Sequence, residues 1–408
     1  MFTPGLKIQY FPLHGGERFD NKFYLRGKHL TEDDVTRGDI PYGLNNEEKS
    51  NQGRLLRYYL EKLTGYNGTE ETREIFLQLQ VPDGRFLYQV PFDEAFDMVA
   101  SPEGKAFIKE TLVYESDTAS DTSVLTVFVN NLGQNSGDYQ MMYVKEQDAL
   151  PRQLVKTFLE SNKRFKLNLN RRLKSLEDVD LVCARKVVLA TSKATLQQIE
   201  WEVLRCFNNT EKRMINALKA LREVPTAQIF MSFPRPWWLH NSSNPTAMTT
   251  TDLPFKEALD WGRSDHTGNY ILLASYADES KAMRMALLNE VGAPSSFSAP
   301  GAGVVSEALI TELLKELADA HGIERGVIPD PVDATAQFWT PGQTGGGRVV
   351  WRAGYNYDDV TAILQRPSGN DDVFVVGADF SAGYNEGFAE SAFETVEKVF
   401  PFISGSFK

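Results

Sequence analysis

Residues 373–387 read VFVVGADFSAGYNEG, and this stretch decides the fold. It opens with a run of apolar residues that predicts a short buried strand, because a strand covered on both faces shows no polar alternation. A glycine ends the run, and a second glycine-rich segment then opens a helix expected over residues 385–399. The backbone N–H groups of such a helix start, beside a buried strand end, can hold an electron-rich group. Junctions of this kind also occur without a ligand, so the rest of the chain has to decide.

Upstream of this stretch, strands and helices alternate in a way that predicts a mixed α/β fold. The continuous apolar run at 187–190 predicts a second fully buried strand. Two apolar runs around Pro82-Asp83-Gly84 predict a hairpin over 75–90. Ser101-Pro102 predicts a helix start, because serine is a good N-cap and proline a good first helical residue. The other expected elements are helices at 53–64, 193–205, 211–223 and 306–321 and strands at 228–233 and 270–276.

The composition of the chain limits which partners it can bind. The chain has 408 residues, of which 42% are hydrophobic, and this is enough for a large core. A net charge of -12 argues against nucleic acid as a partner, because the phosphate backbone would be repelled. No apolar run reaches the roughly 18 residues of a membrane span, and no secretory signal pattern is visible, so we expect a soluble protein of unassigned compartment. The histidines are scattered, and we expect no metal site.

Several segments along the chain occur in the order of one known family. They are Phe2 to Gly5, Asp148 to Arg152, Asn170 to Leu173, Val187 to Thr191, Pro236 to Trp238, Thr250 to Pro254, Leu273 to Tyr276, and the tryptophan- and glycine-rich run from Trp339 to Gly354. Together with the junction at 377–387, they resemble the flavin amine oxidases, specifically the L-amino-acid oxidase branch. No single segment is decisive, and the colinear order carries the resemblance.

The resemblance implies a two-part α/β (mixed α+β) fold. One part is a partial Rossmann-like FAD-binding domain, and the other is a substrate domain of mixed sheet and helices. Residues 1–160 would supply mainly substrate-domain and helical segments, and residues 206–335 the mixed sheet. Residues 161–205 and 336–408 would supply the FAD domain.

The resemblance also implies a reaction and a site. An L-amino acid, or another amine, would be oxidised by bound FAD to give a 2-keto acid, ammonia and hydrogen peroxide. The matching positions for catalysis are Gln228, Tyr384 and Trp351. The matching positions for FAD are Leu173, Trp339, Gly377, Ala378, Asp379, Gly383, Asn385 and Glu386. For the aromatic residues, core packing is the alternative. Members of the family often form homodimers, so a homodimer is one expected assembly.

The sequence departs from the family pattern at two chemical positions. Gln228 stands where the family has a lysine that holds a water near the flavin. Ala378 stands where the family has a glutamate that binds the ribose region, although Asp379 is adjacent. A glutamine offers no positive charge, but its amide can still orient a water.

Two elements of the family match nothing in this chain. They are the GxGxxG strand that grips the ADP half of FAD and the arginine for the substrate carboxylate, and both lie upstream of the first residue. Three hypotheses stay open. In the first, the chain is one part of a split oxidase whose ADP-binding element comes from a second polypeptide. In the second, it is a catalytically inactive binding or structural subunit. In the third, it is an incomplete form of an ordinary oxidase.

Overall fold

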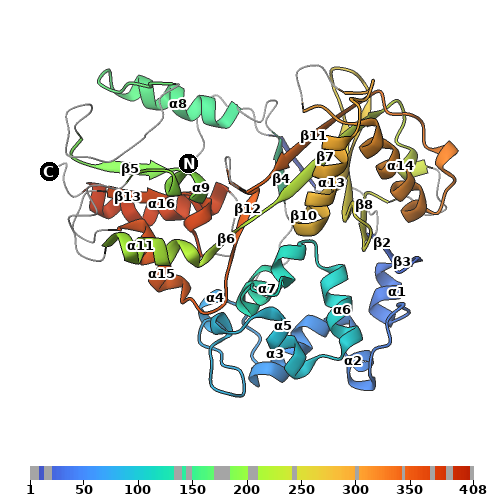
Figure 1. Ribbon diagram of the computed structural model, residues 1–408, viewed down its shortest axis with the longest axis horizontal. Coiled ribbons are helices and arrows are strands. Elements are labelled where there is room, and N and C mark those ends of the chain that lie inside the picture. The colour runs from blue at the N-terminus through green and yellow to red at the C-terminus, as the bar shows by residue number, and fades with distance from the viewer. Residues whose placement is uncertain are drawn as a thin grey trace.

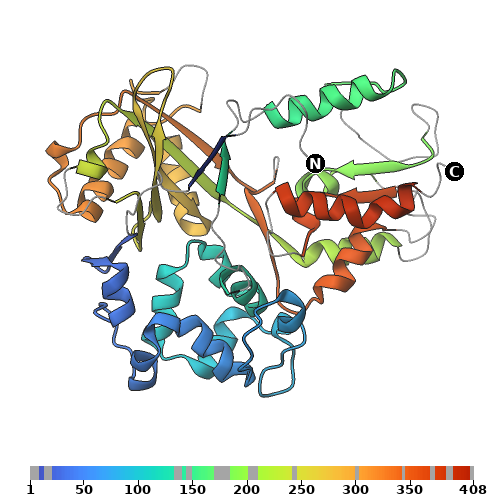
Figure 2. The ribbon, with the colours of Figure 1, turned by 180° about the vertical axis from the view of Figure 1, so that it is seen from behind.

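The computed structural model describes residues 9–12, 21–132, 140–143, 149–169, 184–200, 210–240, 246–298, 303–341, 345–367, 373–382 and 389–404. Figure 1 shows three groups of elements, which we call lobes: the helical lobe (α1 to α7), the sheet lobe (the large sheet with α13 and α14) and the strand-pair lobe (β5, β13 and the helices around them). Figure 2 shows the same three lobes from behind. This combination of sheets and helices confirms the predicted α/β fold class.

The sheet lobe contains a seven-stranded sheet with the order β11-β7-β10-β9-β8-β2-β3. Its strands are β2 (Lys22–Leu25), β3 (Lys28–Thr31), β7 (Thr226–Phe233), β8 (Met248–Thr251), β9 (Glu257–Arg263), β10 (Tyr270–Asp278) and β11 (Asp333–Trp339). Helices α13 (Glu279–Val291) and α14 (Glu307–His321) cover one face, where Ile229, Met231 and Phe233 of β7 are buried in a shared core. Because side chains alternate along a strand, the even-numbered residues of β7 lie on the opposite face.

The helical lobe forms its own part of the core. Its elements are α1 (Glu32–Arg37), α2 (Asn46–Ser50), η1 (Gln52–Arg54), α3 (Leu55–Thr64), α4 (Arg73–Phe76), η2 (Leu87–Gln89), α5 (Phe92–Val99), α6 (Pro102–Thr111), η3 (Glu115–Thr118) and α7 (Val124–Asn131). The helix predicted at 53–64 is therefore confirmed. Phe92, Phe96 and Phe128 stack in the centre and are fully buried. These aromatic contacts tie α5 to α7.

Serine caps fix two helix starts that the sequence predicts. The Ser101 hydroxyl accepts a hydrogen bond from the N–H of Gly104 at 3.0 Å, and α6 follows with proline in its first turn. The Ser306 hydroxyl accepts from the N–H of Leu309 at 3.2 Å, and α14 follows. Both predictions are confirmed, because a capping hydroxyl satisfies an N–H group that the helix cannot.

The hairpin predicted over 75–90 is wrong. The segment instead contains α4 and η2, and only an isolated bridge joins Gln80 to Phe86. The Thr72 side chain accepts from the N–H of Ile75 and starts α4. Phe76 and Leu87 are fully buried among the helices of this lobe. Packing against helices has overridden the local strand pattern.

The strand-pair lobe is built on two parallel strands, β5 (Val187–Ala190) and β13 (Val373–Val376), in register from Val187–Val373 to Ala190–Val376. Around them lie η5 (Ala378–Phe380), α8 (Ala149–Ser161), α9 (Lys193–Gln197), α11 (Thr210–Lys219), α15 (Tyr357–Gln365) and α16 (Ala389–Ser404). A second pair, β6 (Leu221–Val224) with β12 (Arg348–Trp351), runs from this lobe towards the sheet lobe (Figure 1). The other described elements are α12 (Trp237–His240), η4 (Arg325–Val327) and the paired β1 (Gln9–Pro12) and β4 (Gln140–Tyr143).

Three predictions in this lobe are corrected. The helix predicted at 193–205 ends at Gln197. The strand at 187–190 exists, but it is not fully buried, since Val188 is 46% exposed and only Leu189 lies in the core. Its partner β13 is the buried strand of the pair. The helix predicted at 211–223 ends at Lys219, because Leu221 to Val224 pair with β12. Apolar composition alone cannot distinguish a strand that is buried on one face from a strand that is buried on both faces.

The predicted domain boundaries can be compared with the lobes. β11 crosses the boundary at 335/336 and pairs with β7, while α11 packs against α15 although it follows the boundary at 205/206. The division into domains stays a prediction. Among the described residues, no helix is long and apolar enough to cross a membrane.

His321, the last residue of α14, is enclosed beside Trp237. The two rings pack edge to face with 5.0 Å between their centroids. Nε2 of His321 is buried and has no hydrogen-bond partner among the described residues. Burial, reinforced by nearby His29, lowers the pKa of His321 to about 4. Lys22, His29 and Asp34 line the same hollow.

Acid should therefore destabilise the protein through His321. An unfolded histidine takes up its proton near roughly pH 6.5, whereas the folded one resists until about pH 4, so stability falls as the pH drops through this window. The loss should reach on the order of 3 kcal/mol. Urea unfolding followed by tryptophan fluorescence should detect it, and His321→Asn should flatten it. His266→Gln, at an exposed histidine, is the matched control, and an unchanged slope in His321→Asn would refute the assignment.

Candidate active site

The carboxyl ends of β5 and β13 lie side by side, which is where open α/β sheets bind ligands. Gly377 follows β13 with a φ of 144°, a conformation that side-chain-bearing residues rarely adopt. A Cβ at this position would lie 3.3 Å from the carbonyl oxygen of Thr191, which follows β5. The two strand ends therefore approach so closely that the turn requires glycine.

Charged side chains gather at these strand ends. The Asp379 carboxylate accepts a hydrogen bond from the N–H of Lys193 at 2.8 Å, so it joins η5 to the start of α9. Burial raises the pKa of Asp379. Burial also lowers the pKa of Lys193, whose ammonium lies 3.9 Å from the Glu223 carboxylate. Ala378 has no polar side-chain group of its own, so the carboxylate at this edge comes from Asp379.

Three glycines connect these strand ends to the sheet lobe. A Cβ on Gly345 would lie 3.4 Å from the Ser192 hydroxyl, and one on Gly346 would lie 2.4 Å from the carbonyl oxygen of Val224. A Cβ on Gly347 would lie 2.5 Å from the Thr226 side chain. The segment thus passes between the end of β5 and the start of β7, and Gly346 and Gly347 have no room for side chains.

Gln228 lies on the open face of the sheet, opposite the face that α13 and α14 cover. Its cross-strand neighbours are Tyr276 on β10 and Gln337 on β11. Trp339 pairs with Thr226 and lies two residues after Gln337 on β11, so its side chain is on the same open face of the sheet. The structure therefore brings the predicted residues Gln228 and Trp339 together, close to the glycine segment beside Thr226.

Tyr276 and Tyr114 are site residues that the sequence analysis missed. Their hydroxyls are 3.2 Å apart, which joins the sheet face to the helical lobe. The Arg348 guanidinium lies 4.2 Å from the Tyr114 ring centre and forms an ion pair with Asp117 at 3.0 Å. Burial raises the pKa of Tyr276, so its hydroxyl keeps its proton as a donor. Tyr276 ends the segment Leu273 to Tyr276. A β-bulge before Ser275 interrupts the alternation of side chains along β10, so the sequence alone could not show which face of the sheet Tyr276 lies on.

Trp351 lies in the core instead of at an open wall. It is fully buried and stacks on Tyr357 with 4.3 Å between ring centroids. Its Nε1 is buried and has no hydrogen-bond partner among the described residues. This burial favours the core-packing alternative for Trp351, because β12 turns the side chain towards the helical core, and a catalytic role for Trp351 stays a prediction. The large ring fixes the end of β12 below the glycine segment.

The remaining predicted site residues lie outside the described residues. They are Leu173, Gly383, Tyr384, Asn385 and Glu386. Their roles stay predictions.

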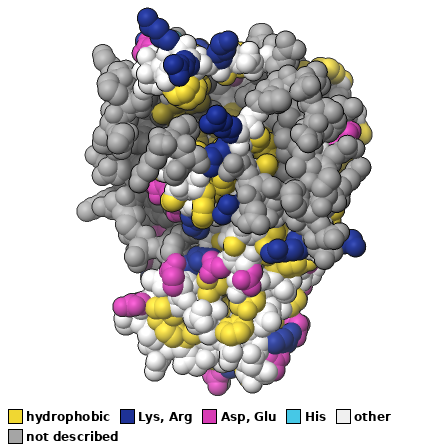
Figure 3. Space-filling model, turned by 90° about the vertical axis from the view of Figure 1, so that its left-hand side faces the viewer, with side chains coloured by type: hydrophobic (Ala, Val, Ile, Leu, Met, Phe, Trp, Pro, Cys, Tyr) yellow, Lys and Arg dark blue, Asp and Glu magenta, His cyan; other side chains and the backbone are white. Residues whose placement is uncertain are grey.

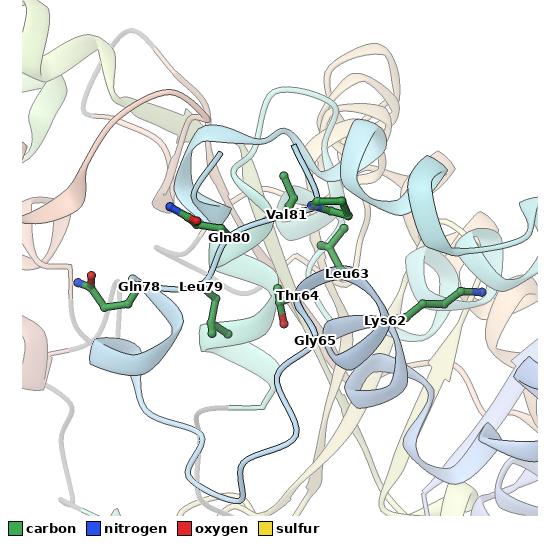
Figure 4. A pocket seen from close by; sticks show the side chains of 9 residues that line it. Lys62, Leu63, Thr64, Gly65, Gln78, Leu79, Gln80 and Val81 are labelled. Carbon is green, nitrogen blue, oxygen red and sulfur yellow. The ribbon is translucent and has the colours of Figure 1, made fainter. Parts of the chain in front are cut away.

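Other parts of the molecule offer less chemistry. The hollow in Figure 4, about 490 Å³, lies between the end of α3 and residues 78–82, and the Lys62 ammonium and Gln78 amide point away from each other. Lys62 is its one ionisable lining residue. In the part of the chain that the structure describes, no three His, Cys, Asp or Glu side chains could hold a metal ion together.

Comparisons with known proteins point to one family. Residues 43–397 match the family model described as flavin containing amine oxidoreductase. Aplysianin-A of Aplysia kurodai is 37% identical over 428 aligned residues, which cover 97% of this chain and 76% of that protein. Achacin of Lissachatina fulica is 39% identical, with 93% of this chain and 75% of that protein covered.

Solved structures support the fold. A cyclohexylamine oxidase from Brevibacterium oxydans superposes with a TM-score of 0.67 at 14% identity and covers 99% of this chain and 83% of that chain. A putrescine oxidase bound to putrescine gives a TM-score of 0.67 at 14% identity, with 98% and 83% covered. The family model and the two relatives confirm the predicted family resemblance and the flavin cofactor that it implies.

A side chain at Gly346 should disturb the junction between the lobes. Gly346→Ala places a methyl group 2.4 Å from the backbone of Val224, and we expect a loss of about 1–3 kcal/mol in the free energy of unfolding. Gly326→Ala is the matched control, because a Cβ there would meet nothing within 4 Å. Thermal unfolding of both variants checks this, and equal melting temperatures would contradict the packing constraint.

Proposed function

The chain belongs to the flavin containing amine oxidoreductase family, and on this premise we propose that it is a component of an FAD-dependent L-amino-acid (or amine) oxidase. The proposed reaction is oxidative deamination to a 2-keto acid, ammonia and hydrogen peroxide. One observation carries the proposal: the glycine segment at 345–347 joins the strand ends beside Gly377 to the open sheet face that holds Gln228 and Tyr276.

The described residues fit an FAD at the strand ends. The turn at Gly377 lets a backbone come close, and Ala378 leaves space beside it. The partly buried ammonium of Lys193 and carboxylate of Asp379 can serve the phosphate and hydroxyl groups of a ribityl phosphate. Trp339 offers an apolar surface at the sheet end. A bound FAD would supply the redox chemistry of the reaction, with oxygen as the final electron acceptor.

The protein's own residues would orient the substrate. The Tyr276 hydroxyl can donate a hydrogen bond to an anionic substrate group, because burial keeps its proton in place. The Gln228 amide can hold a water on the same face. Tyr114, fixed by Arg348, closes the face towards the helical lobe and limits the entry of bulk water.

A second polypeptide fits an exposed surface of the strand-pair lobe, which we call the apolar face. It comprises Val188 of β5 and Phe393, Val396 and Phe400 of α16, which are 40–60% exposed. Figure 3 views this side of the molecule and shows hydrophobic side chains among Lys and Arg. The spacing of the three α16 residues puts them on one helix stripe. A parallel strand pair normally needs cover on both faces, and two strands alone are marginally stable.

We therefore propose that the ADP-binding strand, turn and helix come from another polypeptide that docks on the apolar face. A homodimer is the other assembly that the family suggests. The alternative function is a catalytically inactive binding or structural subunit, and Gln228 and Ala378 favour it, because neither provides the ionic group found at that position in the family.

The absorption spectrum of the natively purified protein tests the oxidase proposal. We expect flavin bands, a second smaller polypeptide on a denaturing gel, and peroxide release that depends on added L-amino acids. A colourless preparation containing this chain alone would favour the inactive alternative. Flavin bands without peroxide from any amino acid or amine would retain the cofactor and refute the oxidase.

A charged residue introduced on the apolar face should prevent the second polypeptide from binding. Val396→Asp changes an exposed side chain, so the chain should stay folded, while the smaller polypeptide and the flavin should be lost on purification. Leu287→Asp, at an exposed position of α13, is the matched control and should keep both. Gel filtration with absorbance detection measures the outcome, and retention of both components by Val396→Asp would place the docking surface elsewhere.

A further inference from the structure

The hydroxyls of Tyr114 and Tyr276 share one hydrogen bond across the boundary between the helical lobe and the sheet lobe. Their oxygens are 3.2 Å apart, and their rings stand at 89° to each other. A hydroxyl carries one hydrogen, so the tyrosine that donates in this pair has none left for another acceptor. The direction of the bond therefore decides whether Tyr276, the cross-strand neighbour of Gln228, can donate to a substrate.

A backbone clamp fixes the distance between the two tyrosines. The Asp278 carboxylate accepts hydrogen bonds from the N–H groups of Glu115 at 2.8 Å and Ser116 at 3.1 Å. Asp278 lies two residues after Tyr276 at the end of β10, and Glu115 directly follows Tyr114 and begins η3. Because Asp278 is buried, water does not compete for these bonds. The two hydroxyls are therefore held within hydrogen-bonding reach, whichever of them donates.

Arg348 makes the two hydroxyls unequal. Its guanidinium lies 4.2 Å from the centre of the Tyr114 ring, and no cation lies over the Tyr276 ring among the described residues. A cation on the face of a phenol stabilises negative charge that develops on it, so the hydroxyl of that phenol becomes the better hydrogen-bond donor. Tyr114 is therefore the favoured donor of the pair, and Tyr276 is the acceptor.

The pKa values of the two hydroxyls agree with this direction. Burial raises the pKa of both Tyr114 and Tyr276, and the charge of Arg348 opposes both rises. The hydrogen bond between them raises the pKa of Tyr114 further but opposes the rise for Tyr276. A bond that Tyr114 donates has this effect, because it holds the Tyr114 proton and stabilises the ionised oxygen of Tyr276.

Asp117 holds Arg348 against the Tyr114 ring. Arg348 begins β12 directly after the glycine segment, and its Nη2 forms an ion pair with Oδ1 of Asp117 at 3.0 Å. The exposed fractions of the two side chains are only 10% and 2%. The Asn130 amide donates to both oxygens of the Asp117 carboxylate at 3.4 Å. A buried guanidinium needs a charged partner, so loss of the Asp117 charge would release Arg348 from the Tyr114 ring.

The hydrogen of the Tyr276 hydroxyl then lacks an acceptor. Among the described residues, this hydroxyl makes no hydrogen bond other than the one with Tyr114. Tyr276 is partly buried, and a donor that is withdrawn from water without an acceptor costs free energy. An anionic group bound over the open sheet face, beside Gln228, would accept this hydrogen and remove the cost.

We propose that Asp117 and Arg348 are positioning residues that make Tyr114 donate to Tyr276, so that Tyr276 presents its own hydrogen to the substrate carboxylate. This inference rests on the proposed oxidase function. Asp117 acts through Arg348, and Arg348 acts through Tyr114. Without the cation on the Tyr114 ring, both directions of the bond would be populated, and Tyr276 would spend its hydrogen on Tyr114 for part of the time. An amine without a carboxylate would gain nothing from this arrangement, which therefore favours amino acids.

The purified flavoprotein with its native partners tests this with L-leucine as substrate. The double variant Asp117→Asn with Arg348→Gln removes both charges together, so that no unpaired charge is left buried. We expect kcat/KM for leucine to fall about tenfold or more, because a hydrogen bond to a charged group is weakened. Adding Tyr114→Phe should restore most of the activity, since the ring then has no oxygen that could accept the Tyr276 hydrogen. If the double variant does not fold, Asp117→Asn alone takes its place, with the same expected loss and recovery.

Arg57→Gln with Glu71→Gln is the matched control, since it removes a comparable, partly buried ion pair that begins on α3. It should leave kcat/KM for leucine unchanged. An unchanged kcat/KM in the Asp117 and Arg348 variant, or a further loss on adding Tyr114→Phe, would overturn the proposal, because purely structural damage accumulates.

If no amino acid yields peroxide, the oxidase function fails, and calorimetric titration with 4-methylpentanoate, which is leucine without its amino group, then decides. Binding that the Asp117 and Arg348 variant weakens about tenfold or more, and that Tyr114→Phe restores, supports the positioning role. Equal binding by all the variants, or no binding to the unsubstituted protein, overturns it.

Discussion

The contact of Gly346 with the backbone of Val224 is the constraint on which the candidate site depends. Val224 ends β6, and Gln228 follows it within the next strand, so the position of the glycine segment sets where the open sheet face meets the end of β5. The glycine segment leads directly into β12. The pairing of β12 with β6 and the stacking of Trp351 on Tyr357 fix the position of this strand. A side chain in this segment would separate the two halves of the site.

Buried charge is distributed unevenly around this junction. In the helical lobe and behind the sheet, Glu48 and Glu316 are bonded to backbone or hydroxyl groups, so their burial serves the fold. At the strand ends, Lys193 and Glu223 face each other at 3.9 Å without a close hydrogen bond. On the open sheet face, Glu257 has no bonded partner among the described residues. The ionic groups at the strand ends and on the open sheet face are thus less completely paired than Glu48 and Glu316.

The same junction explains how a chain without the usual lysine could still contribute to an oxidase. In the proposed reaction, the flavin carries the redox chemistry, and the protein orients the substrate and tunes the polarity around it. Tyr276, Tyr114 and Gln228 can do this with neutral hydrogen bonds. The apolar face of α16 and β5 lies in the strand-pair lobe, so a docking polypeptide would cover the cofactor half of the site and leave the sheet face accessible.

The sequence by itself determined the local elements and the family. Continuous apolar runs predicted β5 and β13, and the Ser101-Pro102 cap predicted α6, because these signals depend only on neighbours along the chain. The colinear segments pointed to the flavin amine oxidases. Only the tertiary structure decided which side chains meet: the bulge before Ser275 sets the face of Tyr276, and Trp351 turns into the core. The periodicity of the sequence determines which side chains share a face of a strand or helix, whereas strand pairing and packing determine which other side chains they contact.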